Sequence, residues 1–139
     1  MQIVAALYIE DIQLRPVPGP STRIDLTGAH FSMAAPGPVP VTLTPHLVVI
    51  VRCPPDHPGT GALEVVYRRG EEQIARNVQP LQVEPGKFNY RLVRAELEFD
   101  DYDTVEAHCR IDLGVATVVP FTLLPPVDAP VEAPTEAPV

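Results

Sequence analysis

The sequence predicts an all-β fold, an antiparallel β-sandwich of about eight strands. Two observations support this prediction. Short stretches rich in Val, Ile, Leu and Tyr alternate apolar with polar residues, which is the period of a half-buried strand. The 18 prolines of this 139-residue chain fall mostly between those stretches, because proline is excluded from helix interiors and from central strands.

The clearest strand signals lie near the C-terminal end of the predicted domain. Apolar and polar residues alternate strictly from residue 104 to residue 113, and they alternate again from 115 to 123. Gly114 separates the two runs, so together they predict a β-hairpin. Pro120 cannot donate a ladder hydrogen bond, which indicates an edge strand or a bulge at that point.

A second hairpin is predicted upstream. Leu63, Val65 and Tyr67 alternate with Glu64 and Arg68, and the turn sequence Arg69-Gly70-Glu71-Glu72 leads into a second strand at 73–78. Residues 88–92 and 95–99 place their large side chains in opposite phases. This shift near Val93 indicates a β-bulge or a strand that crosses between sheets.

Three further strands complete the prediction. Residues 47–51 are continuously apolar, as expected for a central strand covered on both faces. Residues 3–9 and 23–33 supply two more strands, and at most one helical turn is expected, at 12–14 or 100–104. The regular strand spacing favours an Ig-like or jelly-roll-like sandwich over a barrel.

The chain divides by composition into a β-sandwich domain, residues 1–124, and a proline-rich tail, residues 125–139. An acid-Ala-Pro unit recurs in the tail at Asp128, Glu132 and Glu136. Such a sequence cannot bury a core, and it favours a disordered or an extended polyproline II backbone. The tail is therefore expected to solubilise the domain, to tether it, or to dock into a partner's groove.

The charge balance excludes two partner classes. Ten Lys and Arg residues against 18 Asp and Glu residues give a net charge of −8, which repels nucleic acids and anionic membranes. The apolar residues 1–9 have no basic region before them and meet Glu10 at once, so they do not resemble a signal peptide. We expect a cytoplasmic protein, or one built into a larger bacterial or phage assembly. Nine of the ten basic residues are arginine, which suggests a GC-rich bacterial genome.

No residue pattern indicates an enzyme or a cofactor. Cys53 and His57 are a thiol and an imidazole close in sequence, but the two prolines between them are expected to hold the side chains apart. His108 and Cys109 are adjacent, so they point to opposite faces of one strand. His30 and His46 lack metal-ligand spacing. We therefore expect no cofactor and no catalytic residues.

The acidic turn is the one candidate metal site. Asp100, Asp101 and Asp103 supply oxygen atoms of the kind that Ca²⁺ prefers. The segment lacks the D-x-[DN]-x-[DN]-G pattern of calcium loops, and so a solvated acidic turn is the favoured interpretation.

The order of elements resembles a family of small uncharacterised bacterial β-sandwich domains over residues 1–124. The resemblance rests on Ala5-Ala6-Leu7 followed by Asp11, on Leu26-Thr27-Gly28 and Phe31, on the strand at 47–51, on the Gly70 hairpin, and on the closing run at 119–123. It implies a sandwich with no assigned activity. The loop at 33–45 and the tail depart from that pattern.

These observations predict a non-enzymatic protein-interaction or structural subunit that contacts a protein partner, or further copies of itself, through sheet edges and proline-rich loops. Extended proline-rich backbone loses little entropy when it binds. The candidate contact residues are Pro36, Val39, Val41, Pro125, Pro130 and Pro134. The alternative is a β-sandwich that binds a small ligand or a carbohydrate, with Ca²⁺ assistance and with Tyr102 as the stacking surface.

Overall fold

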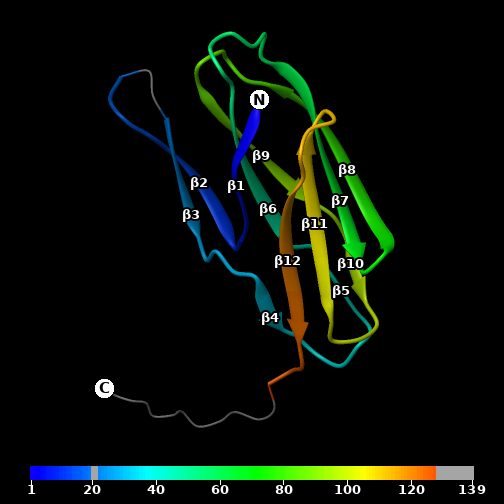
Figure 1. Cartoon of the computed structure of the whole chain (residues 1–139). Helices are drawn as coiled ribbons and strands as arrows, with labels where there is room; N and C mark the ends of the chain where they lie inside the picture. Colours follow the sequence, from blue (N-terminus) through cyan, green and yellow to red (C-terminus); the bar gives the residue numbers. More distant parts are fainter. Residues whose placement is uncertain (20–21, 128–139) are drawn as a thin grey trace, which may run out of the picture.

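The computed structural model describes residues 1–19 and 22–127, and every regular element in those ranges is a β-strand (Figure 1). The all-β prediction is confirmed. The strands are β1 (Gln2–Ile9), β2 (Asp11–Pro16), β3 (Thr22–Thr27), β4 (Ser32–Ala34), β5 (Val41–Leu43), β6 (His46–Arg52), β7 (Thr60–Arg69), β8 (Glu72–Gln82), β9 (Phe88–Arg94), β10 (Leu97–Phe99), β11 (Thr104–Ile111) and β12 (Thr117–Leu124).

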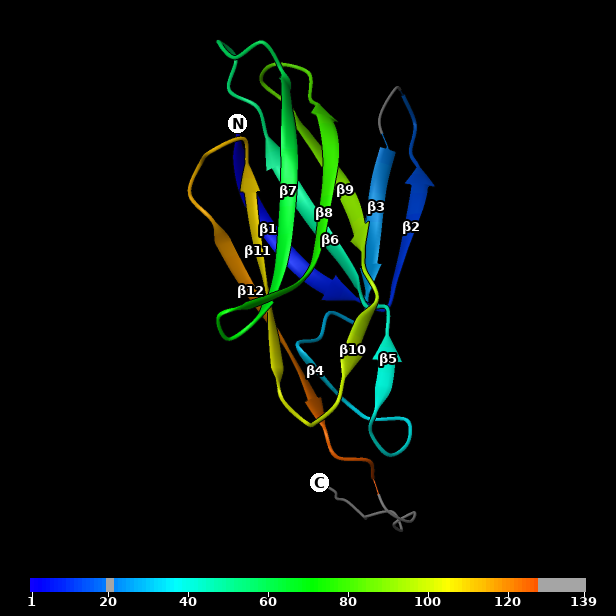
Figure 2. The same cartoon turned by 90° about the vertical axis from the view of Figure 1, so that its right-hand side faces the viewer.

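The strands form two main sheets and two short ribbons. One main sheet has the order β1-β6-β9, and the other has the order β4-β12-β11-β7-β8. All pairs are antiparallel except β4 with β12. The ribbons are β2-β3 and β5-β10. Figures 1 and 2 show the two main sheets lying one behind the other, with β2 and β3 standing apart from both.

Both predicted hairpins are confirmed. β11 pairs with β12 and β7 pairs with β8, in each case antiparallel. Gly70 makes the second turn with a φ of 61°, a left-handed conformation that glycine adopts without strain. The edge prediction at Pro120 is also confirmed, because β4 covers only residues 122–124 of β12.

The region around Val93 is a crossing between sheets. The chain leaves the three-stranded sheet at Arg94 and joins β5 as β10. The continuously apolar β6 is the central strand of its sheet, as predicted. Its inward residues Leu47, Val49 and Val51 are buried, and so is the outward Val48.

One expectation about the strands was wrong, and a helical turn that was possible at 12–14 is not formed. The strand predicted at 23–33 is divided into β3 and β4, because Gly28 turns the chain with a φ of 68°. Residues 12–14 form no helical turn. They lie in β2, where Ile12 and Leu14 pair with Leu26 and Ile24 of β3.

The core lies between the two main sheets. Inward side chains of β6 join those of β7, β11 and β12 in one hydrophobic cluster. Phe121 of β12 is fully buried there, and its ring lies 5.1 Å from that of Tyr8 and 5.7 Å from that of His30. This cluster fixes the three-stranded sheet against the larger sheet and leaves its other face for the β2-β3 ribbon.

Tyr8, Tyr67 and Cys109 carry weakly acidic groups that are buried in this core. The hydroxyls of Tyr8 and Tyr67 have no hydrogen-bond partner among the described residues. Burial raises the pKa of both hydroxyls above their ordinary range, and it raises the pKa of the Cys109 thiol to about 12. All three groups are therefore held in their neutral forms.

Gly59 marks a close approach of two backbones. Its φ is 91°, its carbonyl accepts a hydrogen bond of 2.8 Å from the amide of Val83, and an added Cβ would meet the Val83 carbonyl oxygen. We expect Gly59→Ala to lower the free energy of unfolding by at least about 2 kcal/mol, through backbone strain and this clash. Gly70→Ala, which meets nothing within 4 Å, is the matched control and should cost about 1 kcal/mol. Urea unfolding of both variants measures the difference, and equal losses would contradict the expectation.

Candidate functional site

The β2-β3 ribbon, residues 11–27, forms an arm with one apolar and one polar face. Leu14 lies opposite Ile24, and the next pair along the ribbon is Arg15 with Arg23. Since neighbouring residues of a strand point to opposite faces, the apolar pair shares one face and the arginines share the other. Arg15 and Asp25 form a bidentate ion pair at 2.8 and 2.9 Å on the polar face.

The three-stranded sheet is apolar on its outer face as well as on its inner face. Ile9 and Val48 are buried but lie outside the main core cluster. Ile50 and Tyr90, which pair directly across β6 and β9, are half-buried on the same outer face. A sheet with two apolar faces needs a cover on each, and one of its covers is the arm.

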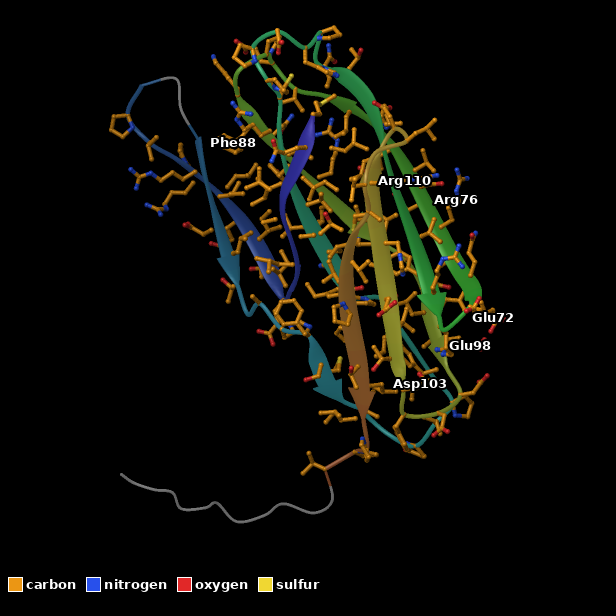
Figure 3. The ribbon with its side chains drawn as sticks, in the orientation of Figure 1. Glu72, Arg76, Phe88, Glu98, Asp103 and Arg110 are labelled. Carbon is orange, nitrogen blue, oxygen red and sulfur yellow. The ribbon has the colours of Figure 1, made fainter. Side chains whose placement is uncertain are left out.

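The arm does not close over the whole outer face. A groove of about 470 Å³ remains between the sheet and the part of the arm that contains Leu14 and Ile24. Uncharged residues line it: Leu14, Ile24, Ile50, Phe88, Asn89 and Tyr90. The side chains of Phe88 and Leu14 are 61% and 58% exposed, although both are large and apolar. Figure 3 labels Phe88, the first residue of β9, on the side of the body that faces the arm.

The charges around this groove differ from those of the whole chain. β1, β6 and β9 contain three arginines and no acidic residue, in a chain of net charge −8. Arg91 reaches away to donate to the Pro80 carbonyl at 3.3 Å. Arg52 and Arg94 fall in the outer phase of their strands, and neither forms an ion pair within residues 1–19 and 22–127. Arg52, which pairs directly with Phe88, therefore places one positive charge at the end of the groove.

The outer face of the five-stranded sheet is different, because its charges neutralise one another. Glu64 accepts hydrogen bonds from Arg76 at 2.8 Å and from Arg110 at 2.7 Å, and these two bonds lower the pKa of its carboxyl group. Figure 3 shows Arg76 and Arg110 on this sheet, away from the arm. Such exposed pairs are ordinary features of a solvated sheet surface.

The long sheet edges are largely occupied. Three side chains bridge β8 and β9: Gln79 donates to the Leu92 carbonyl, Asn89 to the Gln82 carbonyl and Arg91 to the Pro80 carbonyl. On the opposite side, β1 lies against β11 and β12. Edge pairing with a partner is consequently less accessible than contact through the arm and its groove.

The proline-rich contact residues predicted from the sequence are not gathered on one surface. Pro36 is exposed, whereas Val39 and Val41 are half-buried and pack against the core. Val41 also pairs with Phe99 in the β5-β10 ribbon. Pro125 is exposed beyond β12. The other two candidates, Pro130 and Pro134, lie outside the described residues.

The acidic turn does not direct its carboxylates to a common point. Asp103 pairs with Arg69 at 3.0 Å, and Asp101 accepts a hydrogen bond from the amide of Tyr102. Asp100 lines a separate polar hollow with Glu72, Glu96 and Glu98. Within residues 1–19 and 22–127, no three side chains of the metal-binding types are grouped for one ion. The ring of Tyr102 is half-buried against the core, which limits the stacking surface expected of it.

The expectation that prolines separate Cys53 from His57 was wrong. Pro54 and Pro55 form a tight turn closed by the His57 amide and the Pro54 carbonyl at 3.2 Å, which brings the Cys53 Sγ to 3.8 Å from His57 Nδ1. Nevertheless, that nitrogen accepts a hydrogen bond of 2.9 Å from the Gly59 amide, and Cys53 is fully buried. The pair therefore stabilises the loop and offers a substrate no accessible nucleophile.

Sequence reasoning missed the groove. The alternations at 11–15 and 23–26 were available as signals for a two-stranded arm, and the aligned Phe88 and Tyr90 indicated a second apolar face. Neither signal predicts that the arm lies opposite that face. The position of the arm depends on the direction in which the chain turns at Gly28, and a local residue pattern does not give that direction.

Comparisons with known proteins give no further guide to this site. No protein-family model, no curated protein and no solved structure matches the chain. Among the described residues there is no helix long and apolar enough to cross a membrane.

Proposed function

We propose that this protein is a non-enzymatic structural or interaction subunit that binds a protein segment in the groove between its arm and its three-stranded sheet. The arrangement is proposed to be a β-sandwich of the Ig-like or jelly-roll-like kind, with the groove on the outside of the smaller sheet. The observation that carries the function is the uncharged lining of this groove, in which Phe88 and Leu14 leave most of their apolar surface in water. Exposed apolar surface of this kind is typical of protein contacts.

The way the arm is joined to the body supports the same proposal. Only Glu10 and the segment after Gly28 join it to the body, and its two strands pair with each other alone. An arm held in this way can adjust its distance from the sheet and so admit an extended segment. Two aromatic rings and three aliphatic side chains provide the contact surface.

A charge placed in the groove tests this function. We expect Phe88→Asp to abolish association of the full chain with itself or with a purified partner, because a carboxylate in an apolar contact is costly to desolvate. Val118→Asp is the matched control, since Val118 is 45% exposed on the other sheet and should leave association unchanged. Light scattering coupled to size-exclusion chromatography gives the readout, with circular dichroism to verify the fold. Equal behaviour of the two variants would overturn the proposal.

A further inference from the structure

The sequence that follows the described residues is acidic and rich in proline, and it is complementary to an uncharged groove that has an arginine at its end. Residues 128–139 contain three acids and no basic residue, with prolines and valines between them. The three-stranded sheet under the groove contains three arginines and no acid, whereas the arm strands carry two acids and two arginines, which balance. We propose, on the basis of the proposed function, that residues 128–139 of a neighbouring copy of this chain dock in the groove between arm and sheet.

The side chains of the groove suit a proline-rich ligand. Segments that favour polyproline II bind grooves lined by aromatic rings, and they lose little entropy because their backbone is already extended. Phe88 and Tyr90 supply two such rings, and Leu14 and Ile24 supply an apolar wall. Pro130, Val131 and Pro134 offer rings and methyl groups of matching size.

Arg52 provides the electrostatic partner. It is the last residue of β6, it pairs directly with Phe88 of β9, and it lies in the same outward phase as Ile50. It has no acidic partner within residues 1–19 and 22–127. Acids recur every four residues at Asp128, Glu132 and Glu136, so a segment lying along the groove brings one of them to this guanidinium.

The path length assigns the segment to a neighbouring copy. β12 ends at Leu124 beside Ala34, whereas Phe88, which lines the groove, is labelled toward the opposite end of the molecule (Figure 3). The distance between these two places can be followed along the strands. It runs from Ala34 back to His30, crosses to Tyr8, which pairs with His30, and continues along β1 to Gln2. This path covers roughly 33 Å at about 3.3 Å per residue. A chain of as many residues as lie from 125 to 139 spans at most roughly 47 Å at the polyproline II rise of about 3.1 Å per residue. If the segment belonged to the same chain, most of its length would be needed to reach the groove, and only a few residues would be left to lie in it.

Docking of this kind joins copies head to tail. Each copy contributes one acidic segment and one groove, and the two are different surfaces, so the contact is heterologous. Such contacts produce a closed ring or an open chain of subunits, depending on the angle between successive copies.

Photo-crosslinking from position 88 tests the inference directly. In the full chain carrying Phe88→p-benzoylphenylalanine, prepared as a mixture of ¹⁴N and ¹⁵N protein, we expect irradiation to join a light chain to a heavy chain. Mass spectrometry should locate the second attachment within residues 128–139. Crosslinks confined to one chain, crosslinks to any other segment, or a chain that forms no crosslinked dimer would each overturn the proposal.

Charge reversal distinguishes this inference from the proposed function. The pair Glu132→Arg and Glu136→Arg should weaken self-association about tenfold, and adding Arg52→Glu should restore it. The body of the domain is unchanged in the first variant, so loss of folding does not account for the effect. If Phe88→Asp prevents association but the reversed acids leave it intact, the groove keeps its proposed function and the inferred occupant is wrong.

Discussion

Phe121→Ala is expected to lower the free energy of unfolding by about 3 to 5 kcal/mol, enough to unfold a domain of ordinary stability in part. The ring is fully buried and contacts Tyr8 of the opposite sheet, so its removal leaves a cavity between the two sheets. Urea denaturation followed by circular dichroism measures the loss. Leu113→Ala is the control, because that side chain is 87% exposed in the turn after β11 and should change stability by less than about 0.5 kcal/mol.

A result below about 1 kcal/mol for Phe121→Ala would mean that the two sheets do not share the core described above. The size of the effect therefore tests the packing of the two main sheets independently of any function.

The second large effect is a steep loss of stability in alkali. Tyr8, Tyr67 and Cys109 have raised pKa values in the folded protein, by burial in each case and, for the two tyrosines, also by the charges of the neighbouring groups. The unfolded chain loses these protons near pH 9 to 10, while the folded chain keeps them to higher pH. Stability is thus fully present below pH 9 and falls as pH rises beyond it, by up to about 4 kcal/mol per pH unit once all three groups ionise in the unfolded state.

Urea midpoints measured at steps from about pH 8 to about pH 11 reveal this slope. Tyr67→Phe removes one of the three protons and should reduce the slope by about a third. It should cost little near neutral pH, because the Tyr67 hydroxyl has no hydrogen-bond partner among the described residues. A midpoint that does not change with pH, or a slope that Tyr67→Phe leaves unaltered, would contradict the burial of these groups.

The sequence predicted well those parts of the fold in which a local pattern decides the structure. Strict alternation and a glycine turn identify the β11-β12 hairpin, and a continuously apolar run identifies β6. The division of β3 from β4 was missed because one left-handed glycine outweighs an otherwise apolar run. The Cys53 and His57 contact was missed because Pro55 lies in a turn, where its fixed φ bends the chain instead of extending it.

The candidate site was less accessible to prediction than the fold. Groove residues such as Leu14 and Phe88 come from strands far apart in the sequence, and each alone has the pattern of an ordinary strand residue. Their juxtaposition depends on where the arm lies relative to the sheet. Val39 and Val41, predicted as contact residues, are half-buried and pack partly against the core, and Val41 does so in a strand that pairs with β10.

The strand order of the smaller sheet also governs when the protein can fold during its synthesis. β1 pairs with β6, whose residues follow some forty positions later, and β6 pairs in turn with β9. At about 5 to 20 residues per second, the apolar β1 waits roughly 2 to 8 s for its partner. The sheet is complete only after Arg94 has been made. Until then the nascent chain exposes a strand suited to pairing with another nascent chain, and this interval is when aggregation threatens most.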